Sequence, residues 1–185
     1  MKKLILALLC LLSATTTFAQ NGLNGTWFNK ETDTQKEEDK EIRFTSSTTF
    51  IFDGKAYTQT STIEVDMSFS GKDDDGGPVN GHIHIKTEAS TEGQLEQNGK
   101  MLTLTPGKKP KVEVKSEIEG VPGGALVKTM LTNELKKELK SMLKKTQTYK
   151  LISLNDTKMI LVKNLSEKEI KDGAKTEEKT FIRKK

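Results

Sequence analysis

Apolar and polar residues alternate one by one over long stretches of this chain, which is the pattern of half-buried β-strands. The clearest case has four apolar residues separated by single polar ones: Ile63, Val65, Met67 and Phe69. A second run places Ile83 and Ile85 between His82, His84 and Lys86. Such alternation predicts antiparallel strands with one face against a core and one face in water.

Turn signals divide these runs into many short strands. Asp53-Gly54 and Asn98-Gly99 supply the positive φ angles of tight hairpin turns. Residues 31–41 are almost wholly polar or charged, so we expect a solvated loop there, and a second loop at residues 71–78. Further β-prone runs cover residues 26–28, 42–44, 49–52, 79–86, 94–104, 111–119, 149–154, 159–162 and 179–182. The sequence therefore predicts a mainly β chain, an antiparallel up-and-down β-barrel of about 8–10 strands.

A different period marks residues 125–145, where apolar residues recur every three or four positions and predict one amphipathic α-helix. Its apolar stripe consists of Val127, Leu131, Leu135, Leu139, Met142 and Leu143. Five lysines crowd its polar face and C-terminal end, where cations complement the helix dipole: Lys136, Lys137, Lys140, Lys144 and Lys145. We expect the stripe to pack on an end or flank of the barrel. The alternative is a membrane-surface helix attracted to anionic lipid.

The N-terminus has the pattern of a secretory signal peptide. Lys2 and Lys3 precede an apolar run at residues 4–12, and small residues at 17–19 provide a cleavage site after Ala19. We therefore expect residues 1–19 to be a signal peptide and residues 20–185 one domain, exported to the periplasm or the medium. Lipidation at Cys10 is disfavoured because bulky leucines stand on both sides of it.

Removal of residues 1–19 changes the bulk composition. It leaves 166 residues with a net charge of +2 and takes away the single cysteine of the chain. An almost balanced charge gives no reason to expect nucleic-acid binding. Without a disulfide, the domain must be held by its apolar core, which a chain of this length can supply. We expect a monomer.

Catalytic motifs are weak in this sequence. No serine stands in a Gly-x-Ser-x-Gly context, no glycine-rich loop has the spacing of a phosphate site, and the mature chain has no cysteine. We expect a non-enzymatic protein without a cofactor. His82 and His84 form a weak candidate for a zinc or copper site, because alternation puts both rings on one strand face. The simpler interpretation of that face is an exposed polar surface, so we expect no metal.

The start of the mature chain carries a family resemblance. Gly25-Thr26-Trp27 resembles the Gly-x-Trp of the lipocalins and the broader calycin group, and Trp27 is the only tryptophan. Downstream, the chain is similar to the bacterial lipocalin-like domain proteins common among exported proteins of Bacteroidetes. The similar segments are residues 49–55, 101–104, 149–154, 159–161 and 181–183. Two features depart from lipocalins: the helix precedes the last strands, and no cysteine joins the ends.

The resemblance implies a structural role for two residues and a binding role for the barrel. Trp27 would pack at the closed end beside Arg183 of the last strand, where a guanidinium can lie on the indole face. The interior would hold a small hydrophobic or amphipathic ligand, or be filled by its own side chains. The inward residues expected there are Ile63, Val65, Met67, Phe69, Ile83, Ile85, Leu102 and Leu104. The alternative function is an envelope-associated scaffold that uses helix 125–145 for peripheral envelope or protein contacts and encloses no ligand.

Overall fold

Nine antiparallel strands and one long helix make up the computed structural model, which describes residues 22–37, 39–72, 77–107, 109–121, 123–166, 170–171 and 175–184. In chain order the elements are β1 (Gly25–Glu37), β2 (Lys40–Asp53), β3 (Ala56–Lys72), β4 (Pro78–Asn98), β5 (Met101–Pro106), β6 (Lys111–Glu119), α2 (Gly124–Leu143), β7 (Gln147–Leu154), β8 (Lys158–Lys163) and β9 (Glu178–Lys184). The expected signal peptide, residues 1–19, lies outside the described residues.

Eight of the strands close into a barrel. The sheet order is β3-β2-β1-β9-β8-β7-β5-β4, and pairing of β3 with β4 completes the ring. Chain neighbours are also neighbours in the ring, apart from β6 and α2, which are inserted between β5 and β7. This is the up-and-down barrel that the sequence predicted, and it is consistent with a lipocalin-like or calycin-like fold.

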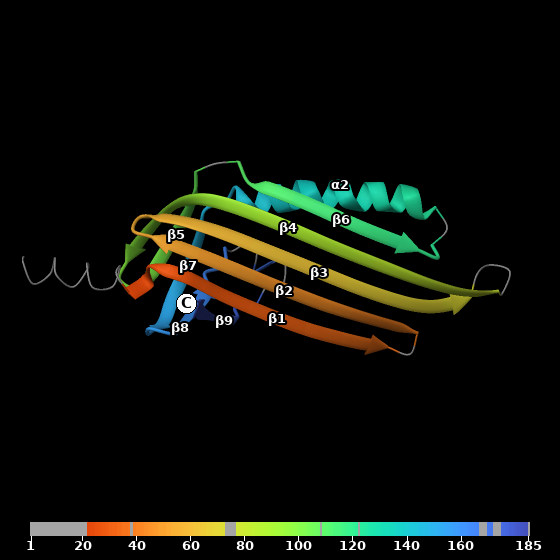
Figure 1. Cartoon of the computed structure of the whole chain (residues 1–185), viewed down its shortest axis with the longest axis horizontal. Helices are drawn as coiled ribbons and strands as arrows, with labels where there is room; N and C mark the ends of the chain where they lie inside the picture. The colour runs from red at the N-terminus through yellow and green to blue at the C-terminus, as the bar shows by residue number, and fades with distance from the viewer. Residues whose placement is uncertain are drawn as a thin grey trace, which may run out of the picture.

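The first four strands are much longer than the barrel. Strand β9 pairs with β1 only at residues 26–28, and β5 pairs with β4 only at residues 93–98. Beyond the barrel the strands continue, and β6 pairs with β4 at residues 82–90. The result is a five-stranded sheet, β1-β2-β3-β4-β6, which projects from the barrel and which we call the sheet extension (Figure 1).

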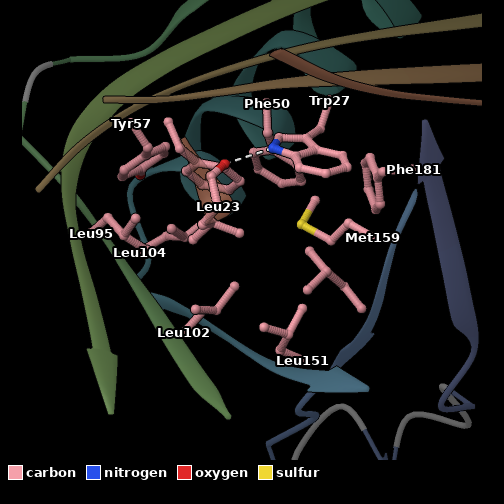
Figure 2. Close-up of a cluster of buried hydrophobic side chains, with 12 residues drawn as sticks. Leu23, Trp27, Phe50, Tyr57, Leu95, Leu102, Leu104, Leu151, Met159 and Phe181 are labelled. Atoms are coloured by element: carbon pink, nitrogen blue, oxygen red, sulfur yellow. Dashed lines mark hydrogen bonds between the residues drawn. The ribbon is translucent and has the colours of Figure 1, made fainter. Parts of the chain in front are cut away.

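Large apolar side chains fill the barrel (Figure 2). Phe50 lies between two other rings, with centroid distances of 5.4 Å to Phe52 and 5.3 Å to Phe181. The remaining members of this cluster come from the segment before β1 and from six other strands: Leu23, Trp27, Tyr57, Leu95, Leu102, Leu104, Leu151, Met159 and Leu161. The barrel core is thus occupied by the protein's own side chains.

Helix α2 lies along β6 on the sheet extension, not over the barrel. The Oγ atoms of Ser116 and Thr132 lie 2.8 Å apart, and Leu143 packs on Ala89 and Val112. The expectation of a helix covering a barrel end or flank was therefore wrong, because β6 pairs with the extended half of β4 and the helix follows β6. Among the described residues, no helix is long and apolar enough to cross a membrane.

The polar segment at residues 31–41 is not a loop. Strand β1 continues to Glu37, and its pairing with β2 extends to the end of the strand, where Glu37 lies opposite Lys40. Its side chains from Lys30 onwards are exposed, as the composition suggested, but backbone pairing with β2 holds the segment extended. Charged side chains on an edge strand also discourage pairing with other chains. The polarity thus reflects an edge position in the sheet.

Candidate ligand-binding site

Eight apolar side chains share one face of the sheet extension. The register places Phe44 beside Val65, and Val65 beside Ile85, so their side chains form a row across three strands. Ile42, Met67 and Ile83 form the next row towards the tip. Together with Ile63 and Phe69 of β3 these residues form a surface that we call the apolar trough. The same alternation along β3 leads from Ile63 to Tyr57 inside the barrel, so the trough continues the inner face of the barrel.

The apolar trough is open. Seven of its eight side chains are half-buried and Phe44 is 40 % exposed, whereas the aromatic residues of the barrel core are almost fully buried. Each side chain is shielded by neighbours in the sheet, while α2 packs mainly against β6, at the border of the trough. An apolar face that lies on one layer of sheet and is only partly covered is a candidate binding surface.

Helix α2 forms one wall of the trough. The helix runs from Gly124 beside Ile118 at the tip towards Leu143 near the barrel. Because an α-helix is right-handed, this direction turns the side that carries Val127, Leu131 and Met142 towards β4 and β3. Val127 and Met142 are 41 % and 57 % exposed. The apolar stripe predicted from the sequence is therefore split: Leu139 and Leu143 pack on β6 and its neighbour, and the other side borders the trough.

A belt of buried polar side chains separates the trough from the barrel core. Asn29 donates its Nδ2 hydrogen to the carbonyl of Thr180 (2.8 Å), and Gln59 lies opposite Thr91 on the same inner face. Gln59 and Thr91 are 8 % and 3 % exposed. Beneath them, burial raises the pKa of Tyr57 above its ordinary value. This belt places hydrogen-bonding groups at the inner end of an apolar surface.

Two hollows connect the trough with the mouth of the barrel. The first, which we call the junction groove, has a volume of about 530 Å³ and includes Phe44 and Ile63 of the trough. The second, the mouth pocket, has a volume of about 220 Å³ and is lined by Phe50, Gln59, Tyr149, Leu161 and Phe181, among others. Thr48, Glu177 and Lys179 border both hollows, so the two adjoin. The trough, groove and pocket form one continuous candidate site.

The predicted ligand residues divide into two sets. Leu102 and Leu104 lie in the barrel core, each 1 % exposed. The other six, Ile63, Val65, Met67, Phe69, Ile83 and Ile85, all belong to the apolar trough. The prediction that they line the barrel interior was wrong in location, because β3 and β4 run far beyond the barrel. Their role in ligand binding stays a prediction.

Sequence reasoning did not single out Ile42, Phe44 or Gln59, although the pattern contains a signal for them. The alternation that runs through Ile63 and Val65 assigns Gln59 to the same apolar face, so it is a polar residue at an inward position. Phe44 and Ile42 join the trough only through the pairing of β2 with β3, which one strand alone does not reveal.

The structure brings Trp27 and Arg183 together, as the resemblance implied. The guanidinium carbon of Arg183 lies 4.6 Å from the centre of the Trp27 ring. The indole donates a hydrogen bond to the carbonyl of Leu23 (2.7 Å), and Arg183 donates to the carbonyls of Gly22 and Asn24. Both residues therefore hold the segment before β1 across one end of the barrel, which is a structural role.

His82 and His84 lie on the opposite, solvated face of β4. The Nδ1 atom of His84 is 2.7 Å from an Asp66 oxygen, and the Nε2 atom of His82 is 3.7 Å from the same oxygen. The hydrogen bond to Asp66 is the main reason that the pKa of His84 is raised, and Glu64 and Glu117 act in the same direction. No group of three or more histidine, cysteine or carboxylate side chains in the described part of the chain is arranged to hold a metal ion. Residues 73–76, in the expected loop at residues 71–78, lie outside the described residues.

Compared with models of known protein families and with curated protein sequences, the chain matches none of them. What the structure establishes is thus the closed eight-stranded barrel with its open apolar trough, a fold consistent with lipocalin-like binding proteins.

Proposed function

We propose that this protein binds an elongated apolar or amphipathic molecule in the apolar trough. The observation that carries the proposal is the set of eight apolar side chains arranged in rows on one uncovered sheet face, with the apolar side of α2 as a wall. The junction groove and the mouth pocket extend this surface to hydrogen-bonding groups at the barrel. An apolar channel with a few polar groups at one end is typical of sites for amphipathic ligands.

The gain from covering the trough is large enough to support binding. Full burial of a large apolar side chain contributes roughly 1.5–3 kcal/mol relative to an exposed one. Because seven of the eight side chains are at most about a third exposed and Phe44 is 40 % exposed, covering the remainder would contribute on the order of 2–8 kcal/mol before the costs of association. A micromolar dissociation constant corresponds to about 8 kcal/mol net, and burial of the ligand's own chain adds about 0.8 kcal/mol per methylene group, which offsets the costs of association.

The proposal includes a non-catalytic role outside the cytoplasm. The signal-peptide pattern at residues 1–19 supports export, and the Trp27–Arg183 contact supports membership of the exported bacterial lipocalin-like proteins. The trough is lined by aliphatic and aromatic side chains, which carry no nucleophile or general base. The protein would carry its ligand unchanged.

The direct test is titration of the delipidated mature protein with dodecanoate, followed by calorimetry. We expect micromolar binding by the native protein and at least a tenfold loss with Met67→Asp, which puts a carboxylate on the trough floor. Ser68→Asp is the matched control, because Ser68 is the next residue on β3 and points to the exposed opposite face. Equal affinities of the two variants, with both folded by circular dichroism, would refute the trough as the site.

A second candidate function is docking to the cell envelope through α2. Leu126 and Met130 are 68 % and 60 % exposed, and helical spacing places them in line with Lys137 and Lys144 on the outer side of α2. A surface of this composition suits anionic lipid. Co-sedimentation with vesicles of phosphatidylglycerol and phosphatidylcholine tests it. Binding that requires phosphatidylglycerol and is abolished by Lys137→Glu with Lys144→Glu would support docking; no sedimentation of the native protein would exclude it.

A further inference from the structure

The mouth pocket contains a buried acceptor without a partner. Gln59 is 8 % exposed, and its Nε2 atom donates to the Oγ of Ser61 at 3.4 Å. Its Oε1 atom is buried and has no hydrogen-bond partner among the described residues. Buried polar atoms are nearly always paired, and leaving one unpaired costs about 1–3 kcal/mol. Because Gln59 lines the mouth pocket, rotation of its side-chain amide would present this acceptor to a donor in the pocket.

The pocket around Gln59 has an apolar floor and a cationic rim. Phe50, Leu161 and Phe181 of the barrel core form the floor. The rim carries three lysines and one carboxylate: Lys163, Lys175, Lys179 and Glu177. One of these lysines, Lys179, forms an ion pair of 2.8 Å with Glu31 at the border of the junction groove. The charges at the rim leave a positive balance, which favours an anionic group.

The dimensions of the pocket limit what can enter. Its volume of about 220 Å³ is equivalent to roughly seven water molecules at the density of the liquid. The pocket therefore suits a compact polar group at the end of an apolar chain, and the chain can leave through the junction groove to the trough, since the two hollows share Thr48 and Lys179.

We propose that the mouth pocket recognises a compact head group that carries an N–H or O–H donor next to an anionic group, as in an N-acylated amino acid. The donor would bind the free Oε1 of Gln59, and the anion would lie near the lysines of the rim. This inference rests on the proposed function, because the acyl chain of the same molecule occupies the trough. Gln59 would then select among amphipathic ligands, whereas the trough supplies most of the affinity.

The test compares two probes with the same apolar chain length by calorimetry on the delipidated mature protein. N-dodecanoylglycine carries an amide N–H before its carboxylate, and dodecanoate lacks that donor. We expect N-dodecanoylglycine to bind about tenfold more tightly, since one hydrogen bond to a previously unpaired acceptor is formed. Equal affinities of the native protein for both probes would overturn the inference while leaving the proposed function intact.

Two variants locate the discrimination at Gln59. Gln59→Met keeps the length of the side chain and removes the acceptor, so we expect the ratio of the two affinities, N-dodecanoylglycine over dodecanoate, to fall below twofold. Gln35→Met, on an exposed position of β1 with the same inward register, is the control and should keep the full preference. A preference that survives Gln59→Met would overturn the inference. Failure of the native protein to bind either probe would overturn the inference and the proposed function together, whereas loss of binding only in Met67→Asp locates the chain in the trough.

Discussion

The contact between Trp27 and Arg183 can be tested as a coupled pair that closes the barrel. Trp27→Leu removes the aromatic ring and its hydrogen bond to the carbonyl of Leu23. Both Trp27 and Leu23 are 0 % exposed, so this hydrogen bond is buried. Loss of a large buried ring together with a buried hydrogen bond should destabilise the protein by about 3–5 kcal/mol. Arg183→Met keeps an apolar chain of similar length and removes the cation.

The second change has a smaller expected cost. Arg183 donates to two backbone carbonyls in a half-exposed position, so Arg183→Met should lower the free energy of unfolding by about 1–3 kcal/mol. The two changes should not be additive, because both residues hold the same segment, residues 22–24, and the guanidinium lies on the indole ring. We expect a coupling free energy of about 1–2 kcal/mol from the double-mutant cycle.

Urea unfolding followed by far-UV circular dichroism measures all four proteins of the cycle without using tryptophan fluorescence. The exposed contact of Lys184 with the ring of Phe28, at 4.1 Å, provides a control cycle. We expect its coupling to stay within about 0.5 kcal/mol, since water competes at an exposed cation–π contact. If the Trp27–Arg183 coupling is no larger than this control, the two residues do not close the barrel as a unit.

Three further predictions concern positions outside the candidate site. Gly93→Ala should destabilise the protein by at least about 2 kcal/mol in urea unfolding, because the added methyl group would clash with the backbone carbonyl of Thr105. The control Gly71→Ala, with nothing near its methyl position, should cost less than about 0.5 kcal/mol. Similar losses at both positions would contradict this prediction. Because the pKa of His84 is raised in the folded protein, its ion pair with Asp66 stabilises the fold fully at pH values below the ordinary histidine pKa. This contribution is lost as the pH rises through the pKa of His84 in the folded state. Both partners are partly exposed, so we expect a loss of under about 1 kcal/mol between roughly pH 5.5 and 8.5, measured by urea unfolding; Asp66→Asn should flatten the profile, and an unchanged profile would exclude the pair as its source. Leu104→Ala should cost about 2–5 kcal/mol by the same measurement, because a cavity remains in the filled barrel core, and a loss below about 1 kcal/mol would indicate a core loose enough to hold a ligand.

The local features of the fold can be predicted from the sequence. Alternation at residues 63–69 identifies both a strand and its apolar face, since side chains point to opposite sides with a period of two. The turns at Asp53-Gly54 and Asn98-Gly99 were also predictable, and both glycines have the positive φ that such turns require. The helix at Gly124–Leu143 lies within two residues of the predicted range 125–145.

Pairing between distant segments decided what local patterns did not. Residues 31–37 look like a loop because nearly all are polar, and only their register with β2 makes them a strand. The same kind of pairing moved six predicted ligand residues out of the barrel. Alternation shows that Ile63 and Ile83 have an inner face, but whether that face is enclosed depends on where β5 and β9 stop.

The sequence by itself determined most of the strands, the hairpin turns and the helix, because each depends on backbone preference or side-chain period, and the family resemblance implied the contact pair Trp27–Arg183. The tertiary structure alone decided that the apolar face opens into a trough and that the Oε1 atom of Gln59, at its inner end, has no partner among the described residues. The physical reason is that burial is a property of the neighbours of a residue. The lengths of eight paired strands set those neighbours, and no single strand encodes them.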